Sequence, residues 1–229
     1  MEDKELSIII PAYQKGEWII NTIESLLKYF PHAEIIIIND GSKDDTKKIR
    51  KIFGERIIYL ENKINRGKGY SLREGFSKAQ GEYLIFTDAD LPFSVKYIDK
   101  VFQELKKQNS IVIATRSKFY NDRFYKKLIR PFLCLMLRIL FGFKYHDTQC
   151  GLKGFTKEKG KKLFSLSIIN GFAIDIEILY LARKLGYLVD KTVVEQEIPF
   201  FKSSTFNFSK ILRAFFDLLI IRFHRYEIS

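Results

Sequence analysis

The feature that most constrains this chain is an alternation of short apolar runs with longer helical patterns between Leu6 and Thr115. Two of the apolar runs, Ile8 to Ile10 and Ile35 to Ile38, are continuous, as is typical of strands that helices cover on both faces. Strands that alternate with helices indicate βαβ units and a parallel sheet. We therefore predict an α/β fold with a doubly wound, mostly parallel sheet.

The pattern changes after Thr115, but no linker or low-complexity segment interrupts the chain. An apolar segment from Phe132 to Phe143 is followed by a turn-rich passage, a helical pattern from Phe172 to Leu185 and a late strand from Thr192 to Pro199. We expect a single domain over residues 1–229, made of a first half (1–115), a second half (116–207) and a C-terminal helix (208–229).

Composition restricts the partners and the compartment. The formal charge of +12 favours anionic partners such as phosphates, nucleic acid or an acidic membrane face. Cys134 and Cys150 give neither a metal-ligand spacing nor a disulfide framework. The charged first residues do not resemble a cleavable signal, and arginines interrupt the best apolar stretches, so we expect a cytoplasmic protein that does not cross a membrane.

The C-terminal segment has the pattern of an amphipathic helix. One interpretation is a helix that packs on the domain's own core. The other, which we predict, is a helix that lies on a membrane surface, where long arginine stems such as that of Arg222 reach the phosphate headgroups. The apolar arc comprises Ile211, Leu212, Phe215, Phe216, Leu219 and Phe223, and the polar side comprises Lys210, Arg213, Asp217 and His224.

Polar motifs follow four of the predicted strands, where ligands of open parallel sheets bind. The most informative is Asp88-Ala89-Asp90, because two carboxylates near one point suit a hard divalent cation, Mg²⁺ or Mn²⁺, that also binds a diphosphate. A lone aspartate at such a position often only caps the next helix. Likewise, the turn from Asn39 to Ser42 is compatible with simple helix capping, and the spacing of Gly67 and Gly69 matches neither a P-loop nor a dinucleotide fingerprint.

Taken together, the motifs PAYxKxE, NDGSxDDT, NRGKG, DAD and ATR resemble those of family 2 glycosyltransferases of GT-A fold. Two later motifs, Asp147 to Gly151 and Phe172 to Glu177, resemble those of the subgroup that makes dolichyl-phosphate or polyprenyl-phosphate sugars. The resemblance is greatest to dolichyl-phosphate β-glucosyltransferases, followed by dolichyl-phosphate mannose synthases. The chain departs from the family pattern at three positions: Asn39 replaces a first aspartate, Lys15 stands where an acidic residue is common, and Pro92 replaces a polar residue.

The resemblance implies a role for each matching residue. Asp88 and Asp90 would bind the metal and act in catalysis with Arg116, which would also approach the acceptor phosphate. The residues that would contact the nucleotide-sugar donor are Pro11, Tyr13, Glu17, Asp40, Lys68, Asp88, Ala89 and Asp90; those that would contact the acceptor phosphate are Arg116, Lys126, Arg130 and Lys202.

We therefore predict an inverting hexose transfer from a nucleotide sugar, UDP-glucose first and GDP-mannose next, to polyprenyl or dolichyl phosphate at the cytoplasmic face of a membrane. A lipid phosphate is already ionised near neutral pH and needs no general base. The first alternative is transfer to a saccharide or lipid hydroxyl, for which Asp175 or Asp147 would serve as the base. The alternative from another class is a non-catalytic basic binding protein, although the paired aspartates argue against it and we expect no nucleic-acid partner.

Overall fold

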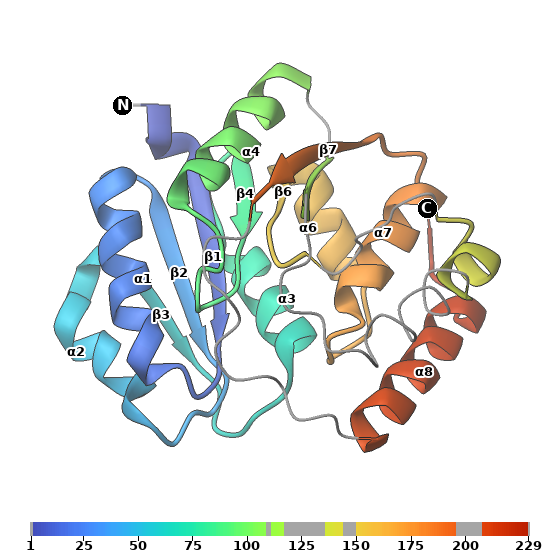
Figure 1. Ribbon diagram of the computed structural model, residues 1–229, viewed down its shortest axis with the longest axis horizontal. Helices are drawn as coiled ribbons and strands as arrows, with labels where there is room; N and C mark the ends of the chain where they lie inside the picture. Colours follow the sequence, from blue (N-terminus) through green and yellow to red (C-terminus); the bar gives the residue numbers. More distant parts are fainter. Residues whose placement is uncertain (1, 109–110, 117–135, 144–149, 196–207, 229) are drawn as a thin grey trace.

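A computed structural model describes residues 2–108, 111–116, 136–143, 150–195 and 208–228 of the chain. Its strands form one mixed sheet in the order β3-β2-β1-β4-β6-β5-β7, with helices on both faces (Figure 1). The strands are β1 (Leu6–Ala12), β2 (Glu34–Asn39), β3 (Ile58–Glu61), β4 (Tyr83–Phe86), β5 (Ile111–Arg116), β6 (Lys153–Thr156) and β7 (Val189–Val194).

Apolar runs in β1 and β2 form the middle of the sheet, as predicted. Ile8 to Ile10 pair in parallel with Ile35 to Ile37, and these side chains are completely or almost completely buried. Side chains alternate between the two faces of a strand, so a run without polar residues must be covered on both. The predicted doubly wound, mostly parallel α/β fold is therefore confirmed.

The helices divide the core into two layers. Odd and even positions of β1 separate accordingly: Ile9 joins the layer covered by α3, α6, α7 and α8, and Ile8 joins the layer covered by α1, α2 and α4. Both layers flank the same sheet in Figure 1. The helices are α1 (Gly16–Tyr29), α2 (Ile49–Phe53), α3 (Lys68–Lys78), α4 (Val95–Gln108), α6 (Lys157–Leu166), α7 (Ile174–Lys184) and α8 (Phe208–Phe223), with short 3₁₀ turns at η1 (Glu2–Glu5), η2 (Asp45–Lys48) and η3 (Gly54–Arg56).

Strand β6 is the main departure from a purely parallel sheet. It runs antiparallel between β4 and β5, with Phe86 opposite Lys153. An antiparallel strand begins at the edge where its parallel neighbours end. The residues just before β6 are therefore brought to the carboxyl end of β4, where the Asp88-Ala89-Asp90 motif begins. The sequence pattern indicated only turns at this point.

The predicted late strand and C-terminal helix are both present, but their ends differ from the predicted ones. β7 ends at Val194, so the predicted strand from Thr192 to Pro199 is displaced toward the N-terminus, and residues 196–199 lie outside the described part. Helix α8 buries Leu218 and Ile221 against the core. No described helix has the length and apolarity needed to cross a membrane.

Candidate active site

The loop after β1 is attached to the loop after β2 by three consecutive backbone amides. The Gln14 N–H donates to the Ser42 hydroxyl at 2.9 Å, the Lys15 N–H to the Thr46 hydroxyl at 3.1 Å, and the Gly16 N–H to the Asp44 carboxylate at 3.0 Å. Asp44 also accepts from the Thr46 amide and caps η2. Helix capping was one interpretation of this segment, and Asp44 does cap η2. The side chains of Ser42, Asp44 and Thr46 also fix the course of the chain after β1.

Asp40 organises the loop that leads into α3. The carboxylate is 3% exposed and accepts hydrogen bonds from the backbone amides of Arg66 and Gly67 at 2.9 and 2.8 Å, and from the Asn62 side chain at 2.8 Å. These donors use both of its oxygens. The predicted contact between Asp40 and the nucleotide base stays a prediction, and the role seen in the structure is to position the loop before Lys68.

A chain of alternating charges crosses the carboxyl end of the sheet. The Lys68 ammonium lies 3.1 Å from Asp88 and 3.0 Å from Asp175, and Asp175 in turn pairs with Lys153. Lys68, Asp175 and Lys153 are almost completely buried, whereas the Asp88 side chain is 36% exposed. Buried charges persist only when they are paired. Each buried charge of the network has an opposite charge beside it, and the series of pairs ends at Asp88, a carboxylate that solvent can reach.

The electrostatics of this network keep Asp175 and Lys68 ionised. Burial opposes ionisation of Asp175, but Lys153 and Lys68 outweigh that effect and hold the pKa of Asp175 below its ordinary value. Burial also opposes the charge on Lys68, and the carboxylates of Asp175 and Asp88 reverse the effect and raise the pKa of Lys68. Asp175 is therefore a deprotonated carboxylate with both oxygens held by lysines.

Gly151, just before β6, permits the close approach of Asp88. A Cβ atom at position 151 would lie 1.8 Å from one Asp88 carboxylate oxygen, so no larger residue fits without displacing that side chain. The position of the loop is fixed because the Lys153 ammonium donates to the Cys150 carbonyl at 2.6 Å. The motif from Asp147 to Gly151 therefore contributes, at its end, a backbone wall for the first aspartate of the pair.

The second aspartate has a separate partner. The Lys15 ammonium lies 2.8 Å from Asp90, and the two side chains are 36% and 26% exposed. Between the two aspartates, the Ala89 carbonyl accepts from the Thr22 hydroxyl of α1 at 2.9 Å, which holds the turn against that helix. Both carboxylates thus lie at the same edge of the sheet, each beside an ammonium group.

The donor set at this edge is compatible with a divalent cation. Two carboxylates on one short turn supply the oxygen ligands that Mg²⁺ and Mn²⁺ prefer, and such ions commonly take further oxygens from substrate phosphates and water. Among the residues that the structure describes, no group of three or more His, Cys, Asp or Glu side chains could hold a metal by itself. The two carboxylates therefore fit a metal ion that takes its remaining ligands from water or from a bound diphosphate.

The other predicted site residues lie partly at this edge and partly outside the description. Tyr13 is 43% exposed and Pro11 is half-buried at the end of β1, and Arg116 is the half-buried last residue of β5. Four other predicted residues lie outside the description: the side chain of Glu17, and the whole of Lys126, Arg130 and Lys202.

Glu177 is a site-supporting residue whose role the sequence did not indicate. It is completely buried and accepts hydrogen bonds from the amides of Ile168 and Ile169 and from the Tyr226 hydroxyl. The neighbouring Asn170 carbonyl accepts from the Gly69 amide at 2.8 Å. Glu177 thus connects the residues after α8 to a loop that packs on the start of α3. The sequence offered two signals, namely the place of Glu177 at the end of the motif Phe172 to Glu177 and its charge within a mostly apolar helical pattern.

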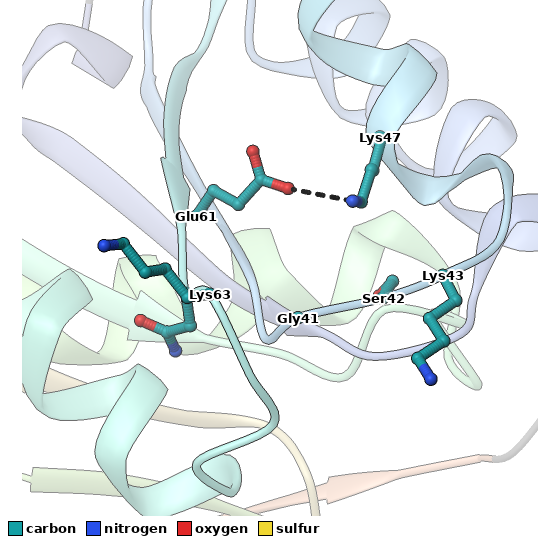
Figure 2. Close-up of a pocket in the computed structure, with 7 residues that line it drawn as sticks. Gly41, Ser42, Lys43, Lys47, Glu61 and Lys63 are labelled. Carbon is teal, nitrogen blue, oxygen red and sulfur yellow. Dashed lines mark ion pairs between the residues drawn. The ribbon is translucent and has the colours of Figure 1, made fainter.

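A shallow pocket of about 470 Å³ lies at the carboxyl ends of β2 and β3. Figure 2 shows the side chains of Lys47 and Glu61 facing one another. The Lys47 ammonium lies 3.8 Å from the Glu61 carboxylate. None of the predicted donor-binding residues lines this pocket. Its lining comprises Gly41, Ser42, Lys43, Lys47, Glu61, Asn62 and Lys63.

Comparison with known families identifies this arrangement. The family model described as "Glycosyl transferase family 2" matches residues 7–169, which include both aspartates, Lys68 and the loop before β6. The chain belongs to glycosyl transferase family 2. The protein is therefore a glycosyltransferase, and the interpretation as a non-catalytic binding protein is set aside. The roles of the paired aspartates stay predictions.

Individual relatives within the family are similar over most of the chain. A dolichyl-phosphate beta-glucosyltransferase of Dictyostelium discoideum is 32% identical over 95% of this chain and 74% of its own length. The protein of the same name from Saccharomyces cerevisiae is 29% identical over 86% of this chain and 67% of its own. The predicted resemblance to this group is confirmed.

Solved structures support the fold. Glucosyl-3-phosphoglycerate synthase of Mycobacterium tuberculosis, in complex with Mn²⁺, UDP-glucose and phosphoglyceric acid, superimposes with a TM-score of 0.71 over 95% of this chain and 79% of its own. The two sequences are 18% identical, so the likeness establishes a shared fold alone.

Proposed function

We propose that this glycosyltransferase moves a glucosyl group from UDP-glucose to the phosphate of dolichol or a related polyprenol, with inversion at the anomeric carbon. The observation that carries the proposal is the similarity, over most of the chain, to relatives named dolichyl-phosphate beta-glucosyltransferases. GDP-mannose is the second candidate donor, and it has no comparable support among these relatives.

The charge network favours a phosphate acceptor over a hydroxyl acceptor. A hydroxyl must lose its proton during transfer, and the base that takes it needs a free lone pair within hydrogen-bond reach. Asp175 was the candidate base, but Lys153 and Lys68 hold its pKa below the ordinary value, which makes it a weaker base, and the group is almost completely buried, out of reach of an acceptor. Asp147, the other candidate, lies outside the described residues. A phosphate acceptor needs no base, because it is already ionised near neutral pH.

The proposed reaction is a single displacement. A phosphate oxygen of the acceptor attacks the anomeric carbon and forms the new C–O bond, while the bond from that carbon to the diphosphate oxygen breaks and UDP leaves with the electron pair. Asp88 and Asp90 would hold Mg²⁺ or Mn²⁺, which neutralises the leaving diphosphate when bound. Lys68 and Gly151 fix the orientation of Asp88, and Arg116 would face the acceptor phosphate.

The direct test is product formation from a panel of UDP- and GDP-hexoses with polyprenyl phosphate and Mg²⁺ or Mn²⁺. We expect glucose transfer from UDP-glucose by the unaltered protein and none by Asp90→Asn, with equal thermal stability of the two proteins. Transfer to a saccharide hydroxyl instead, or no metal-dependent use of any nucleotide sugar, would contradict the proposal. The Asp175→Asn variant does not separate the acceptors by itself, because it also disturbs the network around Lys68.

We further propose that α8 places the enzyme on an anionic membrane surface, where its lipid acceptor resides. The predicted arc of α8 is only partly turned to the core: Phe215, Phe216 and Phe223 are 42%, 54% and 75% exposed. Since successive residues of a helix are about 100° apart, Arg213 and Arg222 border this exposed arc on its two sides. Apolar side chains between cations match the interface of a bilayer that contains anionic lipids. The cytoplasmic face stays a prediction.

Vesicle flotation tests this placement. We expect the unaltered protein to float with vesicles that contain phosphatidylglycerol, and the double variant Phe216→Ser, Phe223→Ser to lose most of that binding. Both side chains are exposed, so the variant should keep its thermal stability. Equal flotation of the two proteins would contradict the proposal. So would a concentration-dependent dimer that the variant abolishes without any binding to vesicles, since a second copy would then cover the arc.

A further inference from the structure

Asp88 and Asp90 are each paired with a lysine, but the two lysines are held very differently. The Lys68 side chain is 9% exposed and has two carboxylate partners, Asp88 and Asp175. The Lys15 side chain is 36% exposed, and within the described part of the chain its ammonium pairs with one carboxylate, that of Asp90, at 2.8 Å. Lys68 is therefore fixed in the protein interior. The Lys15 ammonium, by contrast, can move from Asp90 into solvent, because both side chains of that pair are already partly exposed.

The backbone of Lys15 is anchored even though its ammonium is not. Its amide donates to the Thr46 hydroxyl, and the amides on either side donate to Ser42 and Asp44. The preceding residue, Gln14, adopts a φ of 51°, in the left-handed region that non-glycine residues rarely occupy. Three side-chain acceptors therefore hold the turn in a conformation that directs the Lys15 side chain toward Asp90.

We infer that Lys15 is an exchangeable counter-cation of Asp90: its ammonium neutralises the carboxylate in the donor-free enzyme and is displaced when a divalent cation binds there. The inference rests on the proposed metal-binding role of Asp90 within the proposed function. An ammonium and a divalent cation cannot both lie within bonding distance of the same carboxylate oxygen without strong mutual repulsion. The ammonium that leaves remains on the anchored turn, at the edge where the diphosphate of the donor would bind.

The consequence is that this chain binds a free metal ion less tightly than its carboxylates alone would allow. Exposed ion pairs contribute up to about 1 kcal/mol, which corresponds to about fivefold in a dissociation constant. Removal of the Lys15 ammonium should therefore lower the Kd for Mn²⁺ by about two- to fivefold. Replacement of Lys15 by arginine keeps the positive charge and should leave the Kd for Mn²⁺ unchanged.

The experiment is a titration with Mn²⁺ alone, without nucleotide, in which electron paramagnetic resonance measures the free ion. The proteins compared are the unaltered chain, Lys15→Met, Lys15→Arg and Asp90→Asn. Lys107→Met serves as the matched control, because it removes one positive charge from an exposed pair with Glu104 near the end of α4. We expect tighter binding in Lys15→Met only, and weaker binding in Asp90→Asn.

Several outcomes would overturn the inference. Equal Mn²⁺ affinity in Lys15→Met and the unaltered protein would show that no exchange takes place, and an equal gain in Lys107→Met would show a general effect of net charge. The absence of Mn²⁺ binding in every protein, Lys15→Met included, would also refute the exchange. The titration needs neither donor nor acceptor, so a failure to transfer glucose to a polyprenyl phosphate would leave its result intact and would refute the proposed reaction alone.

Discussion

Replacement of Gly151 by alanine is the sharpest test of how the site is built, because it adds one methyl group beside Asp88. The new Cβ would lie 1.8 Å from one carboxylate oxygen, 2.4 Å from the carboxyl carbon and 2.9 Å from the other oxygen. Real Cβ atoms essentially never approach a heavy atom closer than 3.0 Å, so the pair must separate by at least 3.0 − 1.8 = 1.2 Å.

Asp88 is the partner that should move. The loop at Gly151 is held by the Lys153 hydrogen bond to the Cys150 carbonyl and by the pairing of β6 with β4. The Asp88 side chain is 36% exposed and can rotate, at the expense of its 3.1 Å pair with Lys68. A displacement of about 1 Å in a catalytic group can cost about 100-fold in rate, or about 2.7 kcal/mol of transition-state stabilisation.

We therefore expect kcat/KM for UDP-glucose to fall by about 100-fold in Gly151→Ala, with a loss of global stability of only about 1–3 kcal/mol from overpacking. Steady-state kinetics and calorimetric binding of UDP-glucose measure the first effect, and urea unfolding measures the second. Gly186→Asn is the control, because a Cβ at this glycine meets no atom within 4 Å and asparagine tolerates its φ of +71°. A kcat/KM within about threefold of the control would refute the proposed role of Gly151 as a wall for Asp88.

Three further predictions concern stability. Lys153→Met leaves the buried Asp175 with one cation in place of two, so urea unfolding should show a loss of about 3–5 kcal/mol; a loss below about 1 kcal/mol would contradict the network. Burial raises the pKa of Glu177, so the folded state binds its proton more tightly than the unfolded state does. Relative to Glu177→Gln, the unaltered protein should be most stable below pH 4.5 and should lose that advantage as the pH rises through the raised pKa. An advantage in stability that grew with pH would contradict this prediction. Phe76→Ala removes a core ring that stacks on Phe164, with the ring centroids 3.7 Å apart, and should lower the free energy of unfolding by about 3–5 kcal/mol in the same assay. A loss near zero would mean that the layer repacks around the gap.

Much of the fold follows from local patterns in the sequence. Two uninterrupted apolar runs, Ile8 to Ile10 and Ile35 to Ile38, could bury the side chains of both strand faces only between two helical layers. They form the central pair of strands, β1 and β2. The polar motifs at strand ends were expected to meet at one edge, because parallel strands all end at the same edge. The order and spacing of those motifs also indicated the family, which the match over residues 7–169 confirms.

The C-terminal helix shows where local pattern was insufficient. The sequence placed Phe215, Phe216 and Phe223 on one apolar arc, but the residues buried against the core are Leu218 and Ile221. Periodicity identifies an apolar side of a helix, yet it does not tell which part of a broad apolar side meets the protein. That choice depends on the shape of the surface against which the helix packs.

The sequence by itself determined which residues form the edge of the sheet that carries Asp88 and Asp90, since strand ends and turn residues are local properties. Only the tertiary structure decided what holds those carboxylates. Lys68 and Asp175 are 107 positions apart, and Lys15 and Asp90 are 75 apart. The antiparallel course of β6 then brings Lys153 to Asp175 and Gly151 to Asp88. Charged side chains pair in this way because burial penalises a lone ion wherever it lies in the sequence, and the folded chain determines which opposite charge is near enough to compensate it.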